Sequence, residues 1–293
     1  MEFVYFLAFV IIVWALLCSK SSRFDGTLIK KVHPYRILMG YIYPSRDASV
    51  VYFDADVNAD NLLKYLESDF VKKHHAGITH LIVYAAKLAI EQHPEMNTFF
   101  SGRRFYKRNG VHISFTVKRS LKEKKSKLSV LKMNMSKISS FTEFCKKVNS
   151  SIEIKRSGKD TNADKEYNLL TSLPRFLLEP LIKFVIFLDF FNLLPAFFIK
   201  SDGFFSSLIV TNLGSLKMDP AYHHLYEWGN CPLFLMAGQI TQKAVVVDGK
   251  VVSRNILPLR IAYDERIDDG MTASQGLNKL VEILQAAPDF IKE

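Results

Sequence analysis

The residues best suited to chemistry lie near the C-terminal end, in the segment Asp-Glu-Arg-Ile-Asp-Asp-Gly at 264–270. A carboxylate there can remove a proton from a hydroxyl or thiol, but its ordinary pKa of about 4.3 makes it a weak base at neutral pH. Burial would raise the pKa of Glu265, and neighbouring Asp264 and Asp268 would add to the rise, whereas Arg266 would oppose it. The segment therefore predicts a proton-transfer site only if Glu265 is shielded from water.

A second polar segment, His-His-Leu-Tyr-Glu-Trp at 223–228, brings two imidazoles and a carboxylate close together in sequence. Histidine is the side chain whose ordinary pKa lies nearest neutrality, so His223 or His224 can act as a base. Paired histidines in a loop are more often surface residues. Both roles therefore stay open at this point.

The other candidate ligands do not form a recognisable metal site. Cys18, Cys145 and Cys231 lack the paired spacing of a zinc site or a disulfide framework. The histidines at 74, 75 and 80 have no carboxylate or cysteine at ligand spacing. The net charge of +10 favours an anionic partner. No stacking pattern of aromatic residues accompanies it, so nucleic acid is not predicted, and neither is a metal.

Strands and a turn are predicted to position the 264–270 segment. Alternating or β-branched residues predict strands at 207–213 and 259–263, and Asp248-Gly249 is typical of a type I′ turn in a hairpin over 243–253. A helix with Leu277, Leu280 and Leu284 on one face follows and ends before Pro288.

The first half of the chain has the pattern of a mixed α/β domain. Strands are predicted at 49–57 and 111–117. One helix is expected from a cap at Asp60 to Phe70, and a second from Thr79 to Pro94. The lysine-rich stretch 118–137 is interpreted as a solvated loop and helix face, with a contact to phosphate or to a membrane surface as the alternative.

The N-terminal segment is apolar without interruption from Phe3 to Cys18. As a helix it would be about 24 Å long, slightly short of a hydrocarbon core of roughly 30 Å. No basic residue precedes it, which disfavours a signal peptide, and several follow it, which places the rest of the chain in the cytoplasm. We expect a single-pass membrane anchor at 1–19, a basic linker at 20–34 and the main domain at 35–293.

Residues 173–199 form a second apolar stretch, but charged side chains and three prolines interrupt it. Those charges would be costly at the centre of a bilayer, so a second span is not predicted. The stretch is interpreted as an amphipathic insert. It can lie on the membrane, pack on another subunit, or fill the core of its own domain.

Four segments, in order, resemble the catalytic domain of dihydrolipoamide acyltransferases, the acyltransferase components of 2-oxoacid dehydrogenase complexes. They are a helix ending in His-Pro-x-x-Asn at 78–97, Val-Thr-Asn-Leu-Gly at 210–214, the Val-Val-Asp-Gly hairpin, and 264–270. The last resembles Asp-His-Arg-x-x-Asp-Gly, with Glu265 at the position of the catalytic histidine. Segments 102–110 and 223–229 and the sequence Asp-Glu-Arg-Ile resemble the corresponding segments of free-standing, uncharacterised relatives of this domain. This resemblance suggests that Glu265 is shared by that group of relatives.

The resemblance implies a chloramphenicol acetyltransferase-like fold, a two-layer sandwich of a mixed sheet and helices. It further implies a homotrimer with each active site between subunits, where a thioester of coenzyme A is bound. Thr211 would stabilise the tetrahedral oxyanion, Asp269 would pair with Arg266, and Gly270 would permit the turn into the following helix. Asn212 and Asp264 would be supporting residues of the site.

The resemblance leaves two functions open. The first is acyl transfer between coenzyme A, or another thioester, and an unidentified acceptor, for which a membrane lipid would be consistent with the anchor. The second is a catalytically inactive trimeric scaffold or acyl-ligand-binding protein. The membrane segment and linker occupy the whole N-terminal extension, so no lipoyl attachment site is predicted.

Overall fold

The computed structural model describes residues 1–118, 128–156 and 170–292. In these residues the centre of the fold is a mixed seven-stranded sheet of order β2-β10-β8-β7-β5-β6, with β9 paired to β10. Strand β7 runs parallel to β5 and β8, and the other pairs are antiparallel. The strands are β2 (Val50–Asn58), β5 (His112–Lys118), β6 (Leu128–Asn134), β7 (Leu208–Asn212), β8 (Leu233–Ala237), β9 (Thr241–Val247) and β10 (Lys250–Asp264).

Strand β10 joins two predicted elements into one. Its first half forms the hairpin with β9, and its second half lies between β2 and β8 and ends at Asp264. Asp248 and Gly249 both have positive φ, as a type I′ turn requires. The sequence prediction of the hairpin is therefore confirmed, and the long strand carries the chain directly to the 264–270 segment.

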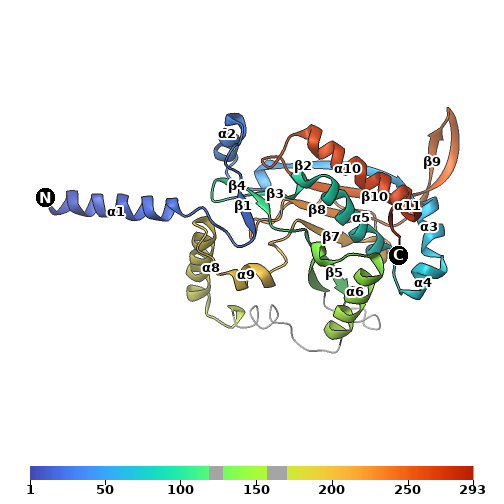
Figure 1. Cartoon of the computed structure of the whole chain (residues 1–293), viewed down its shortest axis with the longest axis horizontal. Helices are drawn as coiled ribbons and strands as arrows, with labels where there is room; N and C mark the ends of the chain where they lie inside the picture. The colour runs from blue at the N-terminus through green and yellow to red at the C-terminus, as the bar shows by residue number, and fades with distance from the viewer. Residues whose placement is uncertain (119–127, 157–169, 293) are drawn as a thin grey trace.

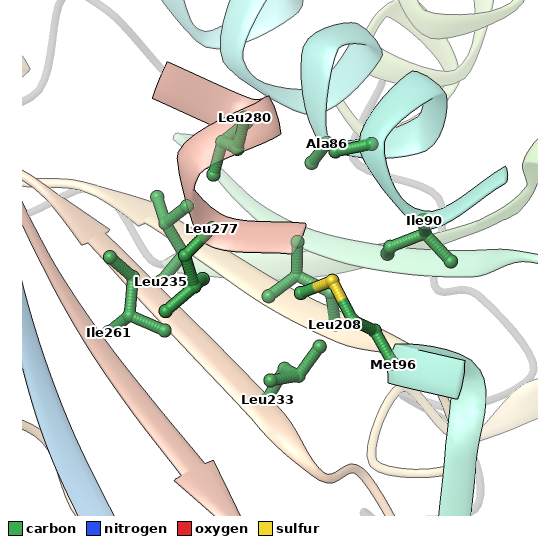
Figure 2. A pocket seen from close by; sticks show the side chains of 10 residues that line it. Ala86, Ile90, Met96, Leu208, Leu233, Leu235, Ile261, Leu277 and Leu280 are labelled. Atoms are coloured by element: carbon green, nitrogen blue, oxygen red, sulfur yellow. The ribbon is translucent and has the colours of Figure 1, made fainter. Parts of the chain in front are cut away.

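Helices cover one face of the sheet, chiefly α5 (Ile78–Gln92), α6 (Phe141–Arg156) and α10 (Gly270–Gln285) (Figure 1). The apolar side chains of α5 and α10 enter the main core because they recur at helical spacing. A cavity of about 20 Å³ lies between α5, α10 and the sheet. Figure 2 shows the apolar side chains that line it, such as Ile90, Leu235 and Leu277. It is too small for a substrate and has no group that could do chemistry.

Three local predictions in this domain are wrong. The helix expected over 60–70 is two helices, α3 (Asp60–Leu66) and α4 (Asp69–Lys73), because the hydroxyl of Ser68 caps a new N-terminus at α4. Asp60 is the first residue of α3, not its cap, and its carboxylate accepts hydrogen bonds from Asn255. Of the basic stretch 118–137, residues 119–127 lie outside the described part, and 128–134 form strand β6, not a helix face.

A small second sheet joins the predicted linker to the domain. It has the order β1-β4-β3, with β1 (Gly26–Leu28), β4 (Arg104–Arg108) and β3 (Thr98–Ser101). Residues 20–34 are therefore partly folded against the domain. Helix α2 (Pro34–Ile42) follows them.

Helix α1 (Glu2–Ser19) projects from one end of the molecule, and α2, α8 (Arg175–Phe190) and α9 (Ala196–Ser201) gather at that end (Figure 1). Among the described residues, α1 is the one helix long and apolar enough to cross a membrane, by length and composition alone. Neither α1 nor α8 has a fully buried residue. The 173–199 stretch is thus helical as expected, but α8 does not fill the core.

Candidate functional site

The signature segment begins with a buried ion pair. The carboxylate of Asp264 is 1 % exposed and accepts two hydrogen bonds from the guanidinium of Arg266, at 2.9 and 2.8 Å. It also accepts a hydrogen bond from the hydroxyl of Ser49, at 2.9 Å. Two parallel bonds of this kind fix the orientation of both side chains, so the backbone on either side of Glu265 is held in place.

Arg46 connects this ion pair to the 223–229 segment. Its buried guanidinium lies 3.8 Å from Asp264 and donates to the backbone carbonyls of Tyr226 and Gly229. The carboxylate of Glu227 in turn accepts from the backbone N–H groups of Arg46 and Asp47. The two polar segments singled out in the sequence are therefore attached to the same short stretch before β2.

Glu265 points outward from this buried base. Its side chain is exposed, and the hydroxyl of Tyr43 donates a hydrogen bond to Oε2 at 3.2 Å. The negative charge of Glu265 raises the pKa of Tyr43 above its ordinary value. The shielding from water that a carboxylate base would need is not supplied by the described residues of this chain.

The structure corrects the roles expected for Asp269 and Gly270. Arg266 pairs with Asp264, not with Asp269. Asp269 instead caps α10 by accepting a hydrogen bond from the backbone N–H of Thr272, and it lies 3.8 Å from Arg36. Gly270 has no positive φ, and a Cβ there would meet nothing within 4 Å. The turn into α10 depends on the cap at Asp269, and nothing in its geometry requires glycine.

Thr211 lies on the face of the sheet opposite the helices. Val210, before it in β7, packs in the main core, and Ile209 belongs to the smaller cluster on the other face, so alternation places Thr211 there too. The register pairs Thr211 with Met236, and Met236 with Arg260. Glu265 follows Arg260 by five residues, which is roughly 16 Å along a strand. A single chain therefore does not bring Thr211 and Glu265 together.

His223 lies closer to Thr211 than Glu265 does. Its ring stacks on Phe234 with centroids 4.2 Å apart, and Phe234 is two residues along β8 from the partner of Thr211. Its Nδ1 is 2.6 Å from the backbone oxygen of His224. Since a carbonyl oxygen can only accept, Nδ1 is the donor in this contact, and in the neutral ring Nε2 is then the acceptor. The hydroxyl of Tyr226 is 3.4 Å from that Nε2.

The remaining predicted residues have clear positions. His224 is exposed and stacks on His223 with ring centroids 4.8 Å apart. The side-chain amide of Asn212 donates to the hydroxyl of Thr79 at 2.9 Å, so it ties the end of β7 to α5. Within 1–118, 128–156 and 170–292, no group of three or more His, Cys, Asp or Glu side chains could hold a metal ion.

A polar cleft of about 190 Å³ adjoins Tyr43. Arg46 and Arg266 contribute to its inner wall, the turn between β3 and β4 contributes Arg103, and α8 contributes Ile186 and Phe190. It lies beside the residues that hold Glu265. It is large enough for a small polar group, and smaller than most ligand pockets.

The sequence did not identify Tyr43, Arg46 or Glu227 as parts of one cluster. Tyr43 and Arg46 precede a strand in a short Tyr-Pro-Ser-Arg segment, and no motif or spacing distinguishes them from ordinary loop residues. In the sequence, Glu227 stands out only as a neighbour of His223 and His224. The contacts that unite them join positions about 180 to 220 residues apart in the chain.

Solved structures share this fold. A probable dihydrolipoamide acetyltransferase from Listeria monocytogenes matches 89% of this chain and 95% of its own, with a TM-score of 0.58 and 15% identity. The dihydrolipoamide acetyltransferase of Azotobacter vinelandii matches 89% of this chain and 93% of its own, with a TM-score of 0.57 and 16% identity. A chloramphenicol acetyltransferase matches 88% of this chain and 99% of its own, with a TM-score of 0.56 and 12% identity. The expected fold is therefore confirmed.

A curated relative shares part of the sequence. The dihydrolipoyllysine-residue acetyltransferase component of the pyruvate dehydrogenase complex of Bacillus subtilis (strain 168) is 33% identical over 82 residues. The match covers 27% of this chain and 17% of that protein. The chain thus spans less than a fifth of the length of this relative.

A family model matches more than half of the chain. It describes the 2-oxoacid dehydrogenases acyltransferase (catalytic domain) and covers residues 44–171 and 203–291. Helices α1, α2, α8 and α9 lie outside the matched segments. With the sheet, the helical layer and the signature all in the matched part, the chain belongs to the acyltransferase catalytic-domain family of the 2-oxoacid dehydrogenases.

Proposed function

We propose that this protein is a membrane-anchored acyltransferase that transfers an acyl group between coenzyme A, or another thioester, and an acceptor bearing a hydroxyl or thiol. The observation that carries the proposal is the shared position of Thr211 and His223 on the face of the sheet opposite the helices. A hydroxyl that can stabilise an oxyanion and an imidazole that can accept a proton are the two groups that acyl transfer requires.

The base removes the proton from the acceptor, whose oxygen or sulfur then bonds to the carbonyl carbon of the thioester. The tetrahedral intermediate carries a negative oxygen, to which Thr211 donates a hydrogen bond. The carbon–sulfur bond then breaks, and the departing thiolate takes the proton back from the base.

Two residues compete for the role of base. Glu265 occupies the position of the family histidine, and its exposure in one chain means that a neighbouring subunit would have to shield it. His223 has the tautomer of a base, and it lies in the same chain on the face that carries Thr211. His224 is exposed and stacks on His223, so we assign it a supporting position only.

A homotrimer would bring Glu265 of one subunit to Thr211 of another. The separation of roughly 16 Å along the sheet supports this arrangement, because Glu265 does not reach Thr211 within one chain. Asp264, Arg266 and Asp269 would then hold the loop that presents Glu265 at the interface. Acyl-coenzyme A and a lipid acceptor would enter this shared site.

The alternative is a non-catalytic trimer that keeps the fold as a scaffold or for acyl-ligand binding. The replacement of the family histidine by Glu265 favours it, because general bases contribute about 10²- to 10⁴-fold to the rate and are rarely dispensable. In that case the membrane anchor α1 would tether the scaffold with its main domain in the cytoplasm.

The test measures turnover of a series of acyl-coenzyme A thioesters by the purified full-length chain in lipid nanodiscs. Three variants are compared with the parent, Glu265→Gln, His223→Asn and His224→Ala. Loss of about 10²-fold or more in kcat for one of the first two, with His224→Ala near the parent, identifies the base. Equal turnover in all of them would rule out both Glu265 and His223 as the base. No turnover with any thioester in the parent would rule out the enzymatic proposal in favour of the scaffold.

A further inference from the structure

Helix α8 presents most of its apolar side chains to the outside. Only a narrow stripe faces the domain and is partly buried, at positions spaced by three or four residues: Leu178, Leu181, Val185 and Leu188. The exposed apolar side chains of α8 are Phe176, Leu177, Ile182, Phe184, Ile186, Phe187 and Phe190. Such a patch on a single helix usually marks a contact with a membrane or with another protein.

The charges on α8 are few and suit a polar–apolar boundary. Glu179 and Lys183 pair with each other at 2.6 Å, and both are more than 70% exposed. Asp189 is turned inward, where it binds the guanidinium of Arg23 at 2.9 Å. Aromatic side chains and a basic residue that can extend to the head groups are typical of helices that lie in the membrane interface.

The C-terminal end of α1 is attached directly to the end of α8. The ring of Trp14 packs edge-on against Phe191, with centroids 5.3 Å apart. The side chain of Asn192 donates to the backbone oxygen of Lys20 at 2.8 Å. Arg104 donates to the carbonyls of Lys20 and Cys18 at the helix terminus. The anchor therefore leaves the domain at α8 without a free linker.

Arg23 makes this attachment rigid. Its side chain is 1% exposed and donates to Asp25, Ser101, Asp189 and Asn192. These partners come from the small sheet, from the end of α8 and from the turn after it. Because a buried and fully bonded guanidinium is costly to release, residues 20–25 cannot act as a flexible spacer.

The length of α1 then fixes the distance of the domain from the bilayer. Its 18 residues form a helix of about 27 Å, which is shorter than a hydrocarbon core of roughly 30 Å. With no spacer after it, the helix can cross only if the end of the domain that carries α8 is drawn against the membrane. In Figure 1, α8 runs across the direction of α1 at this end.

The same end carries other exposed apolar side chains and lies outside the matched family segments. Helix α2 exposes Tyr35, Leu38, Tyr41 and Ile42, and Figure 1 shows α1 leaving the domain in the region between α2 and α8. The family match omits α1, α2 and α8, and covers the sheet and its helices. These elements outside the matched family segments thus share one side of the molecule and one chemical character.

We propose that the outward face of α8 lies in the head-group region of the bilayer in which α1 is inserted. The occupant of this surface is lipid. The proposal rests on the membrane anchor described above and does not depend on catalysis. It also gives the cleft beside Tyr43 a wall, formed by Ile186 and Phe190, that adjoins the membrane.

The test places an environment-sensitive nitrobenzoxadiazole dye on α8 in the full-length chain in phosphatidylcholine–phosphatidylglycerol vesicles. Phe176→Cys is the labelled variant, since this residue is 75% exposed and lies about 20 Å along α8 from the contact with Trp14. The matched control is Val246→Cys, which is 71% exposed on β9 at the opposite end of the molecule. Both carry Cys18→Ser, because the other two cysteines are buried.

The expected result is a blue shift of the dye at 176, loss of emission with shallow nitroxide-labelled lipids and protection from iodide. The dye at 246 should show none of these changes. A dye at 176 that responds like the dye at 246 overturns the proposal. So does a dye at 176 shielded from both quenchers, since a second copy of the chain would then cover α8. Extraction by alkaline carbonate tests separately whether α1 is inserted in the membrane. A chain that resists extraction but gives no dye response at 176 therefore lacks the α8 contact, whereas an extracted chain lacks the anchor.

Discussion

The hydroxyl of Tyr43 donates a hydrogen bond to the carboxylate of Glu265, with 3.2 Å between the oxygen atoms. This contact joins the residue after α2, outside the matched family segments, to the position of the family histidine. Tyr43 also lines the cleft whose opposite wall is α8. The segment that follows α2 therefore contacts Glu265, the position at which the signature differs from that of the family.

The first prediction concerns the titration of Tyr43. The charge of Glu265 raises its pKa, so Glu265→Gln should return that pKa toward the ordinary value of about 10. Carbon-13 NMR of labelled tyrosine rings measures the change. Asp54→Asn is the control, because Asp54 accepts a hydrogen bond from Tyr222 and should shift the titration of that residue alone. An unchanged Tyr43 titration in Glu265→Gln would contradict the contact.

The second prediction concerns the buried charges below Glu265. Asp264→Asn should destabilise the domain by about 3–5 kcal/mol, because it leaves two buried guanidinium groups, those of Arg46 and Arg266, without their carboxylate. The free energy of unfolding is measured by urea denaturation in detergent. The exposed pair of Lys243 and Asp56 provides the control, and Lys243→Gln should cost at most about 1 kcal/mol. Equal losses would mean that Asp264 is not the centre of a buried network.

The third prediction concerns pH. Burial lowers the pKa of His80 to about 4 in the folded chain, whereas an unfolded histidine titrates near 6.5. The unfolded state therefore binds a proton that the folded state excludes. The associated stability is fully present above pH 6.5 and is lost as the pH falls from about 6.5 to 4, by roughly 3 kcal/mol.

His80→Asn isolates this contribution, because asparagine can still accept the hydrogen bond from the backbone N–H of Gly77. The difference in unfolding free energy between parent and variant should shrink or reverse as the pH falls from about 6.5 to 4. Other titrating groups are the same in both proteins, so they cancel. A difference independent of pH would contradict the prediction, because it would mean that the pKa of His80 is the same in the folded and unfolded chain.

The fourth prediction concerns the contact between the small sheet and α8. Gly102 has φ of +55°, and a Cβ there would overlap the backbone oxygen of Phe190. Gly102→Ala should therefore displace the end of α8, cost about 1–3 kcal/mol and speed amide hydrogen exchange in α8. Gly249→Ala is the control, because it has φ of +75° with nothing within 4 Å of the added Cβ. Gly249→Ala should lower the free energy of unfolding through backbone strain, without changing amide hydrogen exchange in α8.

The sequence determined the elements whose signals are local. The Asp248-Gly249 turn, the strands of valine and isoleucine, the helix from residue 78 and the order of the family segments could all be read without coordinates. Each depends on residues close together in the chain, either through turn chemistry or through hydrophobic periodicity. The same locality caused the errors at Ser68 and Asp60, where a cap and a strand contact overrode the helical pattern.

Only the tertiary structure decided how the site residues are grouped. The sequence nominated Glu265, Thr211 and His223, but strand register separates the first from the second and places the third near the second. It likewise assigned Asp269 to Arg266, whereas the fold gives Arg266 to Asp264. Strand register, and the contacts of Ser49 and Arg46 with Asp264 across more than 200 residues, depend on packing of the whole sheet, and no spacing in the sequence encodes them. The residue types were thus readable from the sequence, and their partners were set by the fold.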